Sequence, residues 1–233
     1  MKKVLVKETN KEFIVGKIAC VGKNYLEHAK ELGDAVPEKP VIFLKPSSSI
    51  IFSGEKIVYP EFSKSLHYET ELVLLIGKTG KKISKSEALK YIEAYTVGLD
   101  MTLRDLQSEA KKLGHPWTIS KCFDTSTVLG EFIPASKMQN PNSLDLRLWV
   151  NDELKQNDNT SNMIFSIEEI VEYLSYYFTL EEGDLVFTGT PKGVGEVKVG
   201  DRLRAEIPNV AKLETEVIGW SKLKSHIIII KGS

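Results

Sequence analysis

The sequence predicts an α+β fold in which β-structure dominates and a few helices lie peripheral to the sheets. Eight short segments are rich in β-branched and aromatic residues and are bounded by Gly, Pro, Asn or Asp, which is typical of strands. Only four segments carry a helix start or stop signal. No repeat, low-complexity tract or linker divides the 233 residues, so we expect a single domain at 18–233 after a short N-terminal segment at 1–17.

The predicted strands are short and follow one another along most of the chain. They read KIACVG, PVIFLKP, ETELVLLIG, AYTVGLD, LDLRLWVN, DLVFTGTP, DRLRAEI and HIIIIKG, at residues 17–22, 40–46, 69–77, 94–100, 144–151, 184–191, 201–207 and 226–232. The stretch VNDEL, at 150–154, predicts a hairpin connection between two strands.

Three predicted helices begin at a hydroxyl side chain that an acid follows three residues later, the pattern of a capping box. The pairs are Ser84 with Glu87, Thr102 with Asp105, and Ser166 with Glu169. Asp is a weaker reciprocal partner than Glu in such a box, so the second start is less strongly specified. The stretch NYLEHAKELG, at 24–33, predicts a fourth helix, with Gly33 to end it.

The charge pattern argues against a nucleic-acid partner. The 31 Lys and Arg residues are spread along the chain and the formal net charge is −1, so we expect no basic surface field.

No apolar run has signal-peptide or membrane-spanning length, so we expect a cytoplasmic protein without a membrane partner. Cys20 and Cys122 are too few for a disulfide framework and lack metal-ligand spacing, so we expect two free thiols. Cys122 is a weak candidate nucleophile because no adjacent base completes the arrangement.

Two acids share one face of the predicted strand at 69–77. Alternate strand residues lie about 6.5 Å apart, so Glu69 and Glu71 would repel each other unless one took up a proton or a divalent cation bound both. Carboxylate oxygens are hard ligands that suit Mg²⁺, Mn²⁺ or Ca²⁺. Asp100 ends the strand at 94–100 and supplies a third acid. The pair alone favours a solvent-exposed strand end, and the third acid shifts the balance toward a metal site, although the sequence alone does not bring Asp100 close to Glu69.

Seven stretches resemble, in order and spacing, the fumarylacetoacetate hydrolase family. They are CVGKNYLEHAKELG, KPVIFLKPSSSI, LHYETELVLLIGK, GLDMTLRDLQ, PWTISKCFDT, MIFSIEEIVEYLS and LEEGDLVFTGTPKGVG. Within the family, the likeness is to the small, single-domain acylpyruvase and oxaloacetate decarboxylase branch. The resemblance implies a mixed β-sandwich roll, a homodimer, and Mg²⁺ or Mn²⁺ held by Glu69, Glu71 and Asp100.

The same resemblance assigns roles to six further residues. It implies that His28 and Glu31 form an acid–base dyad and that Lys121 lies in the pocket. It also implies that Arg104, Gln107 and Thr190 contact substrate or the catalytic water. His28 and Glu31 are three residues apart and share a helix face, so the alternative for them is an ordinary surface pair. Arg104 and Gln107 have the same spacing, and the alternative for them is a solvent-exposed helix face, to which we assign Lys111. Thr190 lies in the loop FTGTPKGVG, where backbone N–H groups either approach an anion or form a tight turn.

The implied chemistry is divalent-metal-dependent C–C bond cleavage of small β-dicarbonyl 2-oxo acids. Acylpyruvate hydrolysis or oxaloacetate decarboxylation would each give pyruvate enolate. Two enzymatic alternatives stay open: an isomerase or decarboxylase of unsaturated 2-oxo dicarboxylates, and an oxaloacetate keto–enol tautomerase. The alternative outside enzymes is a noncatalytic metal- or anion-binding dimer. The loop at 33–40 is expected to contribute a lid, whereas the roles of His67 and Tyr68 stay open.

Overall fold

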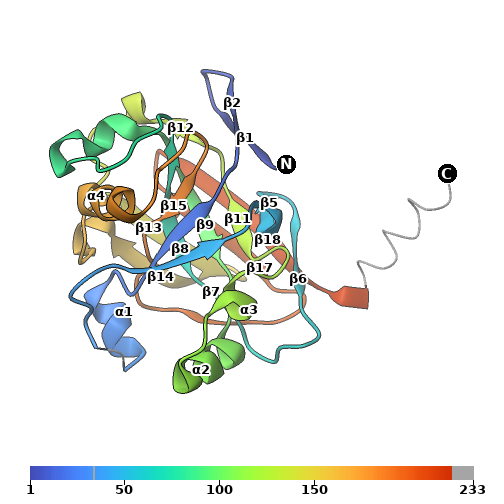
Figure 1. The fold of residues 1–233 in the computed structure, drawn as a ribbon. Coiled ribbons are helices and arrows are strands. Elements are labelled where there is room, and N and C mark those ends of the chain that lie inside the picture. Colours follow the sequence, from blue (N-terminus) through green and yellow to red (C-terminus); the bar gives the residue numbers. More distant parts are fainter. Residues whose placement is uncertain (34, 222–233) are drawn as a thin grey trace.

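A computed structural model describes residues 1–33 and 35–221, and its centre is a mixed sheet (Figure 1). In spatial order the strands of this sheet are β4 (Val41–Lys45), β3 (Ile18–Gly22), β15 (Leu185–Phe187), β8 (Thr70–Ile76), β9 (Ile92–Asp100), β11 (Thr127–Leu129) and β5 (Ile50–Phe52), and β12 (Ile133–Pro134) also pairs with β9. β15 runs parallel to β3, and β11 runs parallel to β5, whereas the other pairs are antiparallel. β8 and β9 lie in the middle of the sheet, so side chains at their ends have fixed positions.

A second sheet of five strands packs against one face of the first. Its order is β14 (Glu153–Asn159), β13 (Asp145–Val150), β17 (Arg202–Ile207), β18 (Ala211–Gly219) and β6 (Lys56–Tyr59). Leu146 and Leu148 of β13 share one apolar core with Leu72 and Leu74 of β8. The two sheets form the strand-dominant, mixed β-roll that the sequence predicted.

The opposite face of the central sheet is covered by the N-terminal hairpin of β1 (Lys3–Val6) and β2 (Lys11–Ile14). Val4 and Phe13 of the hairpin pack with Val73 and Leu75 of β8 in a second core cluster. β8 is therefore buried on both faces, which fixes the direction of its acidic end. A small third sheet adjoins that end, in the order β10 (Thr102–Leu103), β7 (Leu66–Tyr68) and β16 (Gly195–Val197).

The helices lie outside the sheets. They are the α-helices α1 (Leu26–Glu31), α2 (Arg104–Leu113), α3 (Thr118–Lys121) and α4 (Ile167–Tyr177), and the 3₁₀ helices η1 (Ser47–Ser49), η2 (Lys85–Tyr91), η3 (Ala135–Lys137) and η4 (Thr160–Asn162). Figure 1 shows α1, α2 and α3 along one side of the sheets, away from the N-terminal hairpin. Across 1–33 and 35–221, no helix has both the length and the apolar character needed to cross a membrane.

The turn and stop signals in the sequence are confirmed. Asn151 and Asp152 join β13 to β14 with φ of 50° and 69°, the positive values of a type I′ hairpin turn. Gly33 follows Leu32, the C-cap residue of α1, with φ of 66°, a left-handed conformation that ends a helix. The predicted strand at 184–191 ends early, at Phe187. The strand predicted at 226–232 lies outside the described residues.

The predicted capping box of α4 is present. The Ser166 hydroxyl accepts a hydrogen bond from the Glu169 N–H (3.3 Å), and the Glu169 carboxylate accepts one from the Ser166 N–H (2.8 Å). Ser84 is the N-cap residue of the 3₁₀ helix η2, as predicted, but its side chain makes no capping hydrogen bond, so the expected capping box is absent. The Lys85 N–H donates to Glu172 of α4 (3.0 Å), so this start is held by a tertiary contact.

The predicted cap at Thr102 is also wrong. Thr102 lies in β10 and Leu103 is the N-cap residue of α2. The Thr102 hydroxyl donates to the Asp100 carbonyl (3.1 Å) and accepts from the Lys121 ammonium (2.7 Å). Asp105 accepts from the Ser63 hydroxyl instead of forming a box (2.7 Å).

Candidate active site

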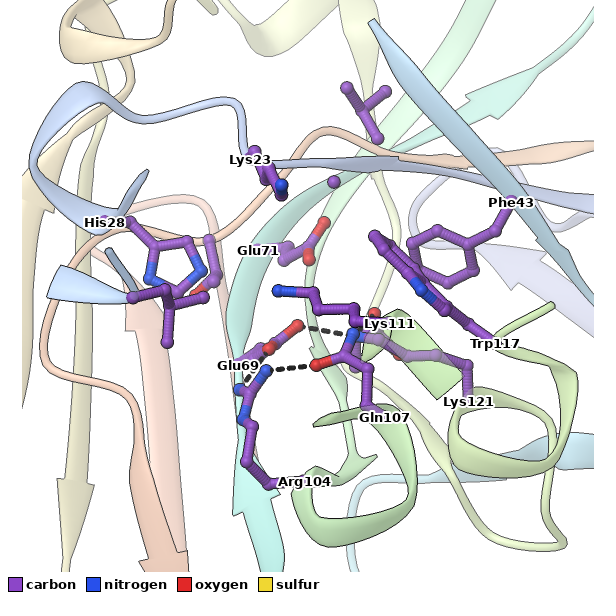
Figure 2. Close-up of a pocket in the computed structure, with 15 residues that line it drawn as sticks. Lys23, His28, Phe43, Glu69, Glu71, Arg104, Gln107, Lys111, Trp117 and Lys121 are labelled. Atoms are coloured by element: carbon purple, nitrogen blue, oxygen red, sulfur yellow. Dashed lines mark hydrogen bonds and ion pairs between the residues drawn. The ribbon is translucent and has the colours of Figure 1, made fainter. Parts of the chain in front are cut away.

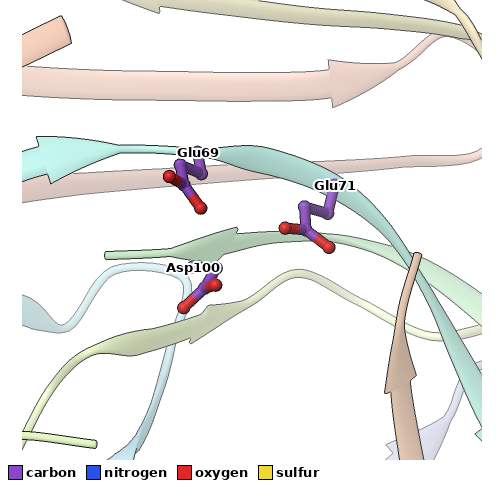
Figure 3. A group of neighbouring side chains, drawn as sticks. All are labelled: Glu69, Glu71 and Asp100. Carbon is purple, nitrogen blue, oxygen red and sulfur yellow. The ribbon is translucent and has the colours of Figure 1, made fainter. Parts of the chain in front are cut away.

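Three carboxylates meet where β8 and β9 end. Glu69 precedes β8, Glu71 lies in it, and Asp100 is the last residue of β9. The Asp100 N–H donates to the Glu69 carbonyl (2.8 Å), which holds the two strand ends together. One carboxylate oxygen from each acid lies within 4.8 Å of the others, and the residues are only 5%, 2% and 1% exposed (Figure 3). The structure therefore brings Asp100 to the Glu69 and Glu71 pair.

Basic side chains surround this triad. The Lys121 Nζ donates to Glu69 Oε2 and to Asp100 Oδ2, both at 2.6 Å. The Arg104 guanidinium donates through Nη2 to Glu69 Oε1 (2.5 Å) and through Nη1 to Gln107 Oε1 (2.6 Å). Figure 2 shows Arg104 and Gln107 extending from the same helix toward Glu69. Arg104, Gln107 and Lys121 are thus in one pocket with the acids.

The acids differ in pKa because their partners differ. Burial opposes the ionisation of Glu69, but Lys121 and Arg104 outweigh it and hold the pKa of Glu69 well below its ordinary value. Burial and the charges of Asp100 and Glu69 raise the pKa of Glu71 well above its ordinary value. Burial lowers the pKa of Lys121 less than Asp100 and Glu69 raise it, so Lys121 is a cation. Glu71 Oε2 accepts a hydrogen bond from the Gly189 N–H (2.6 Å).

The short helix α1 holds the predicted dyad at the pocket wall. His28 Nδ1 lies 3.2 Å from Glu31 Oε2, and His28 is 3% exposed whereas the Glu31 side chain is 35% exposed. Glu31 also accepts from the Gly193 N–H (3.1 Å), which fixes the carboxylate. Burial lowers the pKa of His28 more strongly than Glu69 and Glu31 raise it, so the neutral imidazole is favoured near pH 7.

Thr190 lies on the loop that follows β15. Its hydroxyl oxygen accepts from Gln156 Nε2 (2.9 Å), and the residue is 3% exposed. The predicted residues that line the pocket are His28, Glu69, Glu71, Asp100, Arg104, Gln107, Lys121 and Thr190, while Glu31 stands behind His28. Sequence reasoning therefore collected residues from five separate segments that the fold brings to one place.

Several pocket residues escaped the sequence reasoning. Lys111 was assigned to a solvent-exposed face, which is wrong, because it lines the pocket with its Nζ 5.7 Å from the centre of the Trp117 ring. The signal was available, since Arg104, Gln107 and Lys111 are spaced by three and four residues and share a helix face. Lys23 also lines the pocket.

Lys45 was missed for a different reason. It stands in the apolar strand β4 with a fully buried side chain, and its Nζ donates to Asp100 Oδ1 (2.5 Å) and to the Ser126 carbonyl (2.8 Å). A lone charged residue inside an apolar run is the signal that could have identified it.

The remaining open residues lie outside the pocket lining. His67 Nε2 is 3.1 Å from the Ser65 hydroxyl, and burial lowers the pKa of His67. Tyr68 is buried in the core. Cys20 and Cys122 are free thiols as expected, and burial raises the pKa of both, which makes them poor nucleophiles.

The donor set fits a hard divalent cation. Its three oxygen ligands come from separate carboxylates that are buried and fixed by the sheet. Neither His nor Cys joins the triad, so its chemistry suits Mg²⁺ or Mn²⁺ better than zinc.

Comparisons with known proteins find relatives of this chain both in sequence and in fold. Residues 17–218 match the family described as Fumarylacetoacetate (FAA) hydrolase C-terminal. A mitochondrial oxaloacetate tautomerase of Mus musculus is 46% identical over 200 residues, which cover 86% of this chain and 90% of that protein. Its counterpart from Arabidopsis thaliana is 46% identical over 201 residues, with the same two coverages. The crystal structure of fumarylpyruvate hydrolase from Pseudomonas aeruginosa, in complex with Mn²⁺ and pyruvate, superposes with a TM-score of 0.89 at 39% identity, covering 93% of this chain and 95% of that one.

Proposed function

Because this chain belongs to the fumarylacetoacetate hydrolase family, we propose that it cleaves a C–C bond in small β-dicarbonyl 2-oxo acids and releases pyruvate. The observation that carries the proposal is the pairing, in one pocket, of a buried three-carboxylate site with a neutral histidine held by a glutamate. The three-carboxylate site suits the binding of a 2-oxo acid, and the His28–Glu31 pair suits proton transfer at the far carbonyl.

Glu69, Glu71 and Asp100 would hold Mg²⁺ or Mn²⁺, which as a Lewis acid stabilises negative charge developing on the 2-oxo oxygen. The protein adds fixed positive charge next to this position. Lys121 stays cationic, and the Arg104 guanidinium has the fork geometry that binds a carboxylate. Gln107 orients that guanidinium (2.6 Å).

His28 acts as the base in the hydrolytic reaction. Glu31 binds Nδ1, so Nε2 is left to remove a proton from water. The water oxygen attacks the distal acyl carbon, the C–C bond breaks, and its electron pair becomes the enolate of pyruvate. The imidazolium then returns the proton to the enolate carbon, which gives pyruvate and the free acid. Thr190 accepts from Gln156, so its own hydrogen is available to a substrate oxygen.

The test uses acetylpyruvate and oxaloacetate with Mg²⁺ or Mn²⁺, with pyruvate measured directly. We expect pyruvate from acetylpyruvate, and its loss in His28→Gln while Mn²⁺ binding persists. The matched control is His115→Gln, because His115 is exposed and does not line the pocket. The absence of pyruvate from both substrates with both metals would refute the proposal.

A second candidate function is keto–enol exchange of oxaloacetate. It is favoured by the relatives described as oxaloacetate tautomerases and by a dyad that can move a proton to and from carbon. Following the enol absorbance of oxaloacetate separately from CO₂ release distinguishes the two: rapid enol loss without CO₂ or pyruvate assigns the tautomerase.

We also propose, from the family resemblance, that the protein acts as a homodimer. Sedimentation or light scattering at micromolar concentration checks the oligomeric state, and a monomeric mass would overturn it.

A further inference from the structure

We propose that Gln156 is a positioning residue for this reaction, because its buried amide fixes the direction in which the Thr190 hydroxyl donates its hydrogen. The inference rests on the proposed function, in which Thr190 meets a substrate oxygen. Gln156 stands behind Thr190 and outside the described pocket lining, so it acts through Thr190 and does not touch the substrate.

Gln156 is buried on a strand that is otherwise polar and open to solvent. β14 reads ELKQNDN, and Gln156 is its only buried residue (0% exposed). The pairing with β13 shifts register next to it, which leaves Lys155 as the extra residue of a β-bulge, a device that re-aims a side chain. The loop that carries Thr190 packs on this bulge: at Gly193, an added Cβ would lie 2.3 Å from the Lys155 carbonyl oxygen. Burying an amide costs free energy unless it is hydrogen-bonded, so its hydrogen bonds explain its place.

The partners of the Gln156 amide allow only one orientation. Oε1 accepts from the Thr70 N–H (3.0 Å), and Nε2 donates to the Pro191 carbonyl (2.8 Å) and to Thr190 Oγ1 (2.9 Å). A backbone N–H only donates and a carbonyl only accepts, so the amide oxygen must face Thr70 and the nitrogen must face Pro191. The second N–H then meets the Thr190 hydroxyl, whose oxygen accepts. The hydroxyl hydrogen is thereby turned away from Gln156, on a residue that lines the pocket.

The same amide ties the loop of Thr190 to the strand that carries the acids. Thr70, whose N–H it binds, lies between the two glutamates of the triad. The loop residue before Thr190 makes a second tie, since the Gly189 N–H donates to Glu71 (2.6 Å). Two adjacent links thus hold the loop to the strand, and Thr190 stays at a fixed place relative to the acids.

The kinetic test is a double-mutant cycle with acetylpyruvate and Mn²⁺. Thr190→Val removes the hydroxyl at nearly constant shape, and Gln156→Met removes the amide at nearly constant volume. Each should lower kcat/KM about tenfold, the loss expected for one hydrogen bond. Because Gln156 acts through Thr190, adding Gln156→Met to Thr190→Val should lower kcat/KM by less than about twofold more. Asn157→Met, an exposed position on the same strand, is the matched control and should leave kcat/KM unchanged.

Titration calorimetry with oxalate in the presence of Mn²⁺ separates positioning from a loss of folded protein. The stoichiometry reports the fraction of folded sites, whereas the affinity for oxalate reports the hydrogen bond. We expect both single variants to bind oxalate about tenfold more weakly at full stoichiometry, with no further loss in the double variant. If Gln156→Met does not bind Mn²⁺, Gln156→Glu replaces it, because a carboxyl group keeps an acceptor for the Thr70 N–H but cannot supply two N–H donors.

Strict additivity of the two substitutions in oxalate affinity, or an equal loss in Asn157→Met, would overturn the positioning role of Gln156. Lack of pyruvate formation together with non-additive oxalate binding would instead overturn only the proposed reaction.

Discussion

Lys45→Met measures what a buried cation behind the acidic triad contributes to stability. The Lys45 side chain has no exposed surface, and its Nζ bonds Asp100 Oδ1 (2.5 Å) and the Ser126 carbonyl (2.8 Å). Met fills a similar volume but leaves both acceptors without this donor. Removing one partner of a buried ion pair costs about 3–5 kcal/mol. Asp100 Oδ2 keeps Lys121 at 2.6 Å, so we expect the low end, about 3 kcal/mol.

The assay is urea unfolding of metal-free protein at a fixed concentration, followed by fluorescence and far-UV circular dichroism. Coincident transitions permit a free energy of unfolding to be extracted. The control is Lys3→Met, which breaks the exposed pair with Glu12 (2.8 Å) and should produce no measurable change. Combining Lys45→Met with Asp100→Asn should cost less than the sum of the two single changes, because the second removes the uncompensated charge. A loss below about 1 kcal/mol in Lys45→Met, or strict additivity, would refute the counter-ion role.

Two further predictions concern the dyad and the backbone. Burial depresses the pKa of His28 below 6.5, so the acid limb of kcat/KM should have its midpoint below pH 6.5; a midpoint above 6.5 would contradict this. The same shift means that the folded protein binds fewer protons than the unfolded chain, so unfolding free energy should fall as the pH drops below 6.5. Gly183→Ala should destabilise by about 3 kcal/mol or more, because φ is 92° and an added Cβ would lie 2.1 Å from the Ile14 carbonyl oxygen. Gly114→Ala, with φ of 67° and open space, should cost only about 1–2 kcal/mol, and equal melting shifts would contradict the steric argument.

The sequence was informative about strands that pack through β-branched and apolar side chains, and less so about strands held mainly by their neighbours. β14 reads ELKQNDN and offers no apolar alternation, so its position follows from the Asn151–Asp152 turn and from pairing with β13. β18 reads AKLETEVIG, and its alternate residues are buried, so this strand could have been predicted from its period of two.

The site was predictable where function depends on a local pattern. Strand period places Glu69 and Glu71 on one face, and helix period does the same for His28 and Glu31, but the role of that second pair was implied by the family resemblance. Lys45 and Lys111 carried local signals that were not used, a charge in an apolar strand and a shared helix face, whereas the place of Lys23 depends on where other segments lie. A lysine is ordinarily a surface residue, and only tertiary structure shows that Lys23 and Lys111 line the pocket and that Lys45 pairs with Asp100.

Two of the wrong local predictions have a common physical cause. The Thr102 hydroxyl and the Gly189 N–H, which the local pattern assigned to a helix cap and to a strand, form hydrogen bonds in the site instead. Thr102 has the sequence position of a helix cap, yet its hydroxyl accepts from Lys121 (2.7 Å) and so helps to hold the ammonium between Glu69 and Asp100. The strand expected to run through 191 stops at Phe187. Beyond it, Gly189 has φ of 102° and turns its N–H to Glu71 (2.6 Å), in a space where a Cβ would lie 2.6 Å from the Cβ of Asn24. In a regular strand the Gly189 N–H would bond a neighbouring strand, and at this position a residue larger than glycine would clash with Asn24. The local rules fail here because the Thr102 hydroxyl bonds Lys121 and the Gly189 N–H bonds Glu71, so neither group is used in a helix cap or in sheet pairing.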